Sequence, residues 1–366
     1  MARTTFKHDE LVVLLGAGAS VEAGIPDSNE MVRRVEKETT EGEWRDYLEL
    51  FRYLRSSVFY ADGLKGITGS NVPFNIERLV NVLDELRKKE RHTLYPFVGA
   101  WNPKLQEVAG AGFERVHELR ELIVNVLRRE WVALAESEAA DYYRGLLRFQ
   151  DEFGHALRIF SLNYDLCVEN SCGKETVQRG FAGRMWDWRL FDDGPNEETR
   201  IFLYKLHGSL DWYFAEDGTV SYLDSPSRIA DERVALIFGT SYKLQYVDPF
   251  LFLAYELRRW TLDAARLVVA IGYGFMDEHI NGILGQALRQ DSKRRLLAVV
   301  APQATSRESE TIKFIANQLE AQPEQVRVNA CGARHFLEER LSLDELAALF
   351  PEEEDLIEEL GDGPPS

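Results

Sequence analysis

The sequence predicts an α/β protein: a Rossmann-like parallel sheet with helices on both faces, plus a large helical insertion. Three observations carry this prediction. Short apolar runs recur along the 366-residue chain, helical stretches separate most of them, and a glycine-rich turn follows the first run. Uninterrupted apolar runs are typical of strands buried on both faces, and their alternation with helices is typical of a parallel sheet.

The first expected strand comprises residues 11–15 and ends in a turn that contains Gly16 and Gly18. Gly16 can adopt backbone angles closed to other residues, and Gly18 would let a pyrophosphate approach the main chain. Residues 19–23 are expected to open a short helix whose unpaired N–H groups face the anion. Taken alone, the pattern fits a tight turn without a ligand equally well, because Val21 replaces the third glycine of the dehydrogenase fingerprint.

A helical insertion is expected to follow this turn. The segment Asp27–Glu30 has the spacing of a capping box and is expected to begin a helix. Helical periodicity then replaces the strand pattern, which predicts an insertion at residues 41–150, with residues 1–40 and 151–335 forming the sheet domain. Within the insertion, residues 63–73 are the most loop-like part and are a candidate lid or contact surface.

The later strands are expected to place polar residues at one edge of the sheet. Asn163 and Asp165 follow the second strand, His207 follows the next, and Gly272 follows a later one. Because ligands bind beyond the carboxyl ends of parallel strands, we expect these residues and the first glycine turn to form one site. After the first strand, the expected strands are 156–162, 201–206, 234–238, 266–271, 296–300 and 325–328.

The C-terminal part is expected to contain an amphipathic helix at residues 336–350, packed on the body or on a partner, and an acidic solvated tail at residues 351–366. The net charge of −18 and the absence of a basic run argue against direct nucleic-acid binding. No apolar run approaches the roughly 20 residues that span a bilayer, and the start of the chain lacks the apolar core of a signal peptide. We therefore expect a cytoplasmic protein without membrane association.

Metal binding is not expected. The three cysteines, Cys167, Cys172 and Cys331, form no Cys-x-x-Cys pair, which argues against a zinc ribbon and against a disulfide framework. Cys167 falls in a predicted helix between apolar neighbours, so a buried thiol is the favoured interpretation.

Asn163 and His207 are the residues best suited to chemistry. An amide both donates and accepts hydrogen bonds, so Asn163 could fix a water molecule or a ribose hydroxyl; the structural alternative is a helix cap. The near-neutral titration of a histidine suits His207 to proton transfer, whereas a lone histidine on a strand is more often a satisfied core residue.

Four motifs together resemble the sirtuin family. They are Gly-Ala-Gly-Ala-Ser-x-x-x-Gly-Ile-Pro-Asp at residues 16–27, Asn-x-Asp at 163–165, His-Gly at 207–208 and a glycine strand end at 272–275, in the family's order. The segments 206–212 and 271–281 look closer to the bacterial sirtuin-like effectors of antiphage defence than to histone deacylases. The chain departs from the deacylase pattern in three ways. It lacks the cysteines of the zinc ribbon, it has Asn29 where an arginine is usual, and it has a large helical insertion between the first two motifs. The Gly239-Thr-Ser241 string is interpreted as a neighbouring loop.

The resemblance implies cleavage of the bond between nicotinamide and ribose in NAD, which gives ADP-ribose, with NAD as substrate and no metal. Asn163 would hold the water and the ribose, His207 would transfer a proton at a ribose hydroxyl, and Asp165 would orient the ribose. The pyrophosphate would be bound by Gly16, Ala17, Gly18 and Ser20. The nicotinamide-side ribose would lie near Asp27, and the adenosine would face Gly272 and Tyr273.

The resemblance further implies a toxic effector of abortive infection that works as a homo-oligomer, alone or with an ATPase of the HerA type or a short Argonaute protein. Two alternatives stay open: an NAD-dependent protein deacylase, and a non-catalytic scaffold that senses NAD or ADP-ribose. A hydride-transferring dehydrogenase is disfavoured, because the acidic residue that would bind the ribose does not follow a second strand at the required distance.

Overall fold

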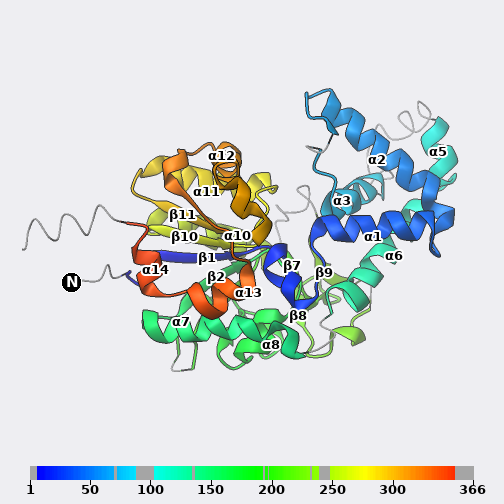
Figure 1. Cartoon of the computed structure of the whole chain (residues 1–366). Coiled ribbons are helices and arrows are strands. Elements are labelled where there is room, and N and C mark those ends of the chain that lie inside the picture. The colour runs from blue at the N-terminus through cyan, green and yellow to red at the C-terminus, as the bar shows by residue number, and fades with distance from the viewer. Residues whose placement is uncertain are drawn as a thin grey trace, which may run out of the picture.

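The computed structural model describes residues 6–69, 72–87, 103–133, 137–192, 194–196, 198–230, 233–238 and 248–350. A seven-stranded sheet forms the centre of the molecule, in the order β12-β11-β10-β1-β2-β6-β3 (Figure 1). All neighbouring strands in it are parallel, which confirms the predicted Rossmann-like α/β fold. The strands are β1 (Leu11–Leu15), β2 (Leu157–Ser161), β3 (Val177–Gln178), β6 (Ile201–Lys205), β10 (Leu267–Ile271), β11 (Arg295–Val299) and β12 (Val326–Asn329).

The strand order reverses at β1. The chain adds β2 and β6 on one side of β1, then returns to add β10, β11 and β12 on the other side. The register places Leu15 level with both Ser161 and Ile271, and Ser161 level with Lys205. The loops that follow these strands therefore start in one row, at the switch point where α/β proteins bind ligands.

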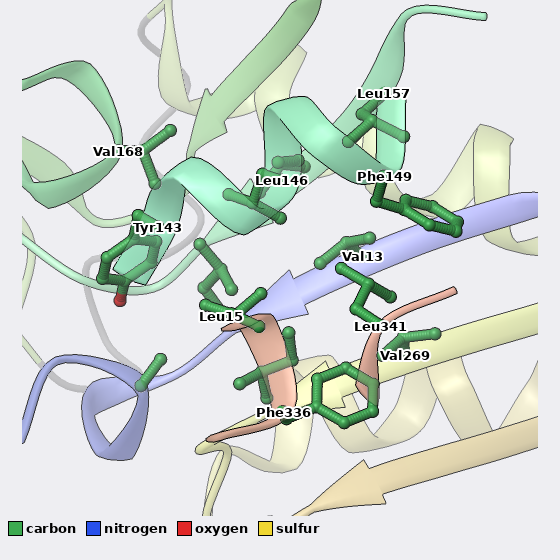
Figure 2. Close-up of a cluster of buried hydrophobic side chains, with 14 of the residues drawn as sticks. Val13, Leu15, Tyr143, Leu146, Phe149, Leu157, Val168, Val269, Phe336 and Leu341 are labelled. Atoms are coloured by element: carbon green, nitrogen blue, oxygen red, sulfur yellow. The ribbon is translucent and has the colours of Figure 1, made fainter. Parts of the chain in front are cut away.

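Two apolar layers cover the sheet. One layer contains η6 (Ser137–Arg144), α7 (Gly145–Phe153), α8 (Cys167–Cys172) and the C-terminal segments; Figure 2 shows Phe336 and Leu341 beside Val13, Leu15 and Val269. The other layer contains α10 (Phe250–Asp263), α11 (Glu278–Gln290) and α12 (Glu308–Leu319). Both faces of β1 and β10 are buried, which explains why these two strands are apolar at every position.

The C-terminal segment differs from the single helix expected at residues 336–350. It forms α13 (Ala333–His335) and η11 (Phe336–Arg340), breaks at Leu341, and resumes as α14 (Leu343–Ala347). The Ser342 side chain accepts the N–H of Glu345 and thereby starts α14 anew. The segment packs on the body of the protein, and residues 351–366 lie outside the described residues.

A helical subdomain lies beside the sheet (Figure 1) and has its own apolar core, as expected from the predicted helical insertion. Asp27 caps its first helix as expected, accepting the N–H groups of Asn29 and Glu30. The side-chain packing groups the described residues of the ranges 28–69, 72–87 and 103–133 into this subdomain, whereas η6 and α7 pack on the sheet. Its helices are α1 (Ser28–Thr40), η2 (Arg45–Tyr47), α2 (Leu48–Gly63), α3 (Ile76–Arg87), α5 (Pro103–Ala109), α6 (Glu114–Val126) and η5 (Leu127–Trp131).

A second, antiparallel sheet corrects one prediction. Residues 234–238 were expected to belong to the parallel sheet, but β9 pairs antiparallel with β7 in the order β4-β5-β8-β7-β9. The chain reverses at Gly208, whose φ of 85° is left-handed, so that β7 runs back from the end of β6. The strands are β4 (Phe181–Ala182), β5 (Met185–Trp186), β7 (Gly208–Phe214), β8 (Val220–Tyr222) and β9 (Val234–Leu236).

The short helical turns that remain are η1 (Ala17–Ala23), α9 (Arg189–Asp192), η7 (Pro226–Arg228), η9 (Pro302–Arg307) and η10 (Pro323–Gln325). Among the helices in the described ranges, none combines the length and apolar character needed to cross a bilayer.

Gly272, directly after β10, is a position where only glycine fits. Its φ is +63°, and a Cβ there would lie 2.0 Å from the Ala19 nitrogen. We expect Gly272→Ala to lower the free energy of unfolding by about 2 to 4 kcal/mol. Gly282→Ala is the matched control, because a Cβ there meets no atom within 4 Å, and the exchange within α11 should stabilise by about 0.5 to 1 kcal/mol. Denaturant unfolding of both variants tests the pair; equal stabilities would contradict the account of Gly272.

Candidate active site

The first glycine turn lies directly against the turn that follows β10. A Cβ on Gly18 would lie 2.9 Å from the Gly272 Cα, and one on Gly16 would lie 2.6 Å from the Tyr273 Cα. The N–H of Gly18 donates to the Gly272 carbonyl at 2.9 Å, and the N–H of Ala19 donates to the Gly16 carbonyl. This corrects the expectation that the N–H groups at this helix start are unpaired. The glycines are needed here because two main chains touch; Ala17 and Gly18 are the partly exposed residues of the turn.

Ser20 joins three segments of the chain. Its hydroxyl donates to Asp165 Oδ2 at 2.8 Å and accepts from Asn163 Nδ2 at 3.2 Å. The hydroxyl of Tyr143 lies 2.9 Å from the same oxygen, and burial raises the pKa of Tyr143 well above its usual value, so this phenol stays protonated and donates. One donated and two accepted bonds use the full capacity of a hydroxyl. Ser20 thus holds Asn163 and Asp165 together, a role that differs from the pyrophosphate binding expected of it, and Tyr143 is a partner that the sequence did not indicate.

Asp165 fixes the loop after β2 from several sides. Its Oδ1 accepts the Cys167 N–H at 3.0 Å at the start of α8, and its carbonyl oxygen accepts a hydrogen bond from the Lys205 ammonium. With Oδ2 bound to Ser20, the side chain is engaged at both oxygens. Asp165 is therefore placed to orient its neighbours in the loop rather than to act alone.

Asn163 presents one open acceptor. Its main-chain N–H donates to the Ser161 hydroxyl, and its Nδ2 donates to Ser20. The Oδ1 atom is buried, and within the described part of the chain it has no hydrogen-bond partner. A buried acceptor without a donor is unfavourable, so this oxygen is suited to a water molecule or a ligand hydroxyl.

His207 lies two residues beyond the end of β6 and is 2% exposed. Its Nε2 lies 3.5 Å from Asp277 Oδ2, and its Nδ1 lies 3.9 Å from Glu77 Oε1. Neither ring nitrogen makes a hydrogen bond to any residue that the structure describes. Burial, followed by the two carboxylates, raises the pKa of Tyr164, whose ring lies 6.3 Å from the imidazole. The candidate base thus lies between two carboxylates.

Two predicted ligand residues have other tasks in this structure. Asp27 caps α1 through one carboxylate oxygen, which accepts at 2.9 and 2.7 Å. The ring of Tyr273 is buried, and its hydroxyl donates to Asn281 Oδ1 at 2.8 Å. The expectation that Tyr273 faces the adenosine is therefore corrected for its side chain, which packs in the core beside Phe275.

A buried group of four charges supports the loop from behind. Arg179 pairs with Asp211 at 2.6 Å and lies 3.8 Å from Glu169, which in turn lies 3.8 Å from the Lys205 ammonium. All four are less than a tenth exposed. Burial raises the pKa of Glu169, and the two cations act against this shift. Because Lys205 also binds the Asp165 carbonyl, these charges connect the antiparallel sheet to the site.

The site is closed in this structure. Ser20, Asn163, Asp165 and His207 are each less than a tenth exposed. A cavity with a volume of about 390 Å³ lies between α1, α2 and the residues Gly69, Val72 and Phe74, and none of the four site residues lines it. Cys167 and Cys172 are free and buried, and burial raises the pKa of the Cys172 thiol to about 12. The Gly239-Thr-Ser241 string lies outside the described residues.

The parallel sheet, the glycine turn and the polar loops at the switch point define an α/β protein of the Rossmann-like class. Residues 157–322 match the family model of the SIR2-like domain, which is consistent with a sirtuin-like domain in this part of the chain. This match contains Asn163, Asp165, His207 and Gly272, and β1 with its glycine turn joins them in space. A search of curated proteins found no match for the chain.

Proposed function

We propose that the chain hydrolyses NAD to nicotinamide and ADP-ribose. One observation carries the proposal: the Asn163 Oδ1 and both ring nitrogens of His207 are buried without hydrogen-bond partners among the described residues. They follow neighbouring strands of the sheet at its switch point, within the SIR2-like domain. Buried polar groups are normally paired, so open ones at such a place are suited to a polar substrate.

In the proposed reaction, Asn163, His207 and the two nearby carboxylates have different roles. The Asn163 oxygen accepts a hydrogen bond from a water molecule and directs the water's oxygen at C1′ of the nicotinamide-side ribose. The C1′–N bond breaks with its electron pair going to the nicotinamide nitrogen, and water oxygen bonds to C1′. His207 takes the released proton through a ribose hydroxyl. The positive charge that develops on the ribose is favoured by nearby carboxylates, which Glu77 and Asp277 supply.

Pyrophosphate binding is proposed for Gly16, Ala17, Gly18 and Ser20, and adenosine binding for the main chain at Gly272. Gly18 and Ser20 use their hydrogen-bonding groups within the protein, so this end of the site has to rearrange when NAD enters. Asn163 Oδ1 needs no such rearrangement, because it has no hydrogen bond to break among the described residues.

A closed site also fits a controlled activity, because unrestrained NAD hydrolysis would deplete the host cell. We therefore propose an effector of antiphage defence, held inactive until a signal opens it. A homo-oligomer, an ATPase of the HerA type or a short Argonaute protein would supply that signal through the helical subdomain or the C-terminal segment. These assignments rest on the resemblance to sirtuin-like effectors and on the burial of the site.

The test is product analysis. The purified chain, alone and with the products of neighbouring genes, is incubated with NAD, and the nucleotides are separated by chromatography. We expect nicotinamide and ADP-ribose in equal amounts. An acetylated peptide is added in a parallel arm: transfer of its acetyl group to ADP-ribose would instead indicate a deacylase. Binding of NAD without turnover in every arm would contradict hydrolysis and favour a nucleotide-sensing scaffold.

A further inference from the structure

His207 lies between two carboxylates that come from different parts of the chain. Asp277 belongs to the sheet domain and follows the turn after β10, whereas Glu77 lies in the first turn of α3 in the helical subdomain. They face opposite nitrogens of the imidazole, at 3.5 Å from Nε2 and 3.9 Å from Nδ1. The sequence analysis assigned no role to either residue.

Asp277 is the fixed partner. Its Oδ1 accepts the N–H groups of His279 and Ile280 and so caps α11, which aims Oδ2 at the Nε2 of His207. The side chain is 8% exposed. A neutral imidazole carries one N–H, and a carboxylate at Nε2 favours the tautomer with the proton there. Nδ1 then carries the lone pair and is the nitrogen available to a substrate.

Glu77 lies on the Nδ1 side. A lone pair and a carboxylate at 3.9 Å are two acceptors that face each other, and a donor between them would satisfy the imidazole nitrogen. The Glu77 side chain is 24% exposed, compared with 8% for Asp277, so it is the more solvent-accessible of the two carboxylates. A ribose with two neighbouring hydroxyls supplies two donors in the required spacing.

We propose that Glu77 is a ribose-binding residue: its carboxylate and His207 Nδ1 together accept the two hydroxyls of the nicotinamide-side ribose, while Asp277 positions the ring. The inference rests on the proposed function and deepens it, because it assigns part of the substrate site to the helical subdomain. Tyr164 after β2, Leu210 in β7 and Phe238 after β9 pack in that subdomain's core, and Glu77 of α3 lies 3.9 Å from His207. A site completed from both parts works only while they are docked.

The test separates ribose binding from turnover. In an Asn163→Ala background, which prevents hydrolysis, ADP-ribose and ADP are titrated by calorimetry; ADP lacks the second ribose. We expect Glu77→Ala to weaken ADP-ribose binding about tenfold or more and to leave ADP binding unchanged, since the lost bond has a charged acceptor. Glu77→Gln keeps one acceptor oxygen and should lose less. Glu85→Gln is the control, because Glu85 is an exposed carboxylate on the same helix.

The outcomes distinguish the two proposals. Equal ADP-ribose affinity in Glu77→Ala and Glu85→Gln would overturn the role of Glu77 and leave NAD hydrolysis standing. Failure of the parent chain to bind ADP-ribose or NAD would overturn both. Histidine-selective ¹⁵N NMR of the unliganded full chain gives an independent result: the ring assigned to His207 should be neutral with its proton on Nε2, and Asp277→Asn should alter that tautomer. An imidazolium bridging both carboxylates would overturn the assignment of Nδ1 to the ribose.

Discussion

His207→Ala should fold and lose NAD hydrolysis by about 10²- to 10⁴-fold, the usual contribution of a general acid–base group. Asn163→Ala should be affected comparably, because it removes the open Oδ1 that would hold the attacking water. Both side chains follow strands of the central sheet and cap no helix, so neither exchange breaks an element. Initial rates of nicotinamide release at saturating NAD measure the effect.

The matched control is His8→Ala. His8 is exposed and lies before β1, at the sheet edge opposite the site. It should retain wild-type turnover and serves as the reference for purification and folding. Rates within about twofold of wild type in both His207→Ala and Asn163→Ala, with the folded state verified by circular dichroism, would rule out the assigned site.

Arg179→Met should lower the free energy of unfolding by about 3 to 5 kcal/mol, the usual result of removing one partner from a buried ion pair. The exchange leaves Asp211, which is fully buried, without its 2.6 Å partner and removes a cation beside Glu169. It also removes the guanidinium that lies 4.7 Å from the centre of the Tyr222 ring. Denaturant unfolding followed by tryptophan fluorescence measures the loss.

Arg52→Met provides the comparison for a surface pair. Arg52 and Glu49 are both more than half exposed at 3.3 Å, and such pairs contribute about 1 kcal/mol or less. If Arg179→Met were as mild as Arg52→Met, the four buried charges would not be a cooperative unit, and their support of the Asp165 loop would have to come from elsewhere.

The parallel sheet could be predicted because the apolar residues of its central strands indicate in the sequence that these strands are buried. β1 and β10 are apolar at every position, and both faces of each are covered. The antiparallel sheet could not be predicted in the same way. β4 and β5 are two residues each, and β7 contains the buried Asp211, whose charge is paired with Arg179 from the segment between β3 and β4. A buried charge is compatible with a strand once its partner is known, and local pattern does not reveal the partner.

The site, like the fold, could be predicted only in part from the sequence. Ser20, Asn163 and Asp165 meet because strand ends in a parallel sheet meet, and the sequence identified those ends. Glu77 was not identifiable, since it lies within a helical pattern far along the chain from His207, and only the docking of α3 brings them together. Tyr143 was assigned to the insertion, yet its helix packs on the sheet and its hydroxyl reaches Ser20.

Tyr164, Leu210 and Phe238 belong to the part of the chain outside the helical subdomain, but they are buried in that subdomain's apolar core. A sheet domain from which the helical subdomain had been removed would expose these three apolar side chains near the imidazole of His207. The sheet domain is therefore not expected to be autonomous, and a protease that cuts the chain on either side of the helical subdomain should abolish the proposed activity while every strand remains intact.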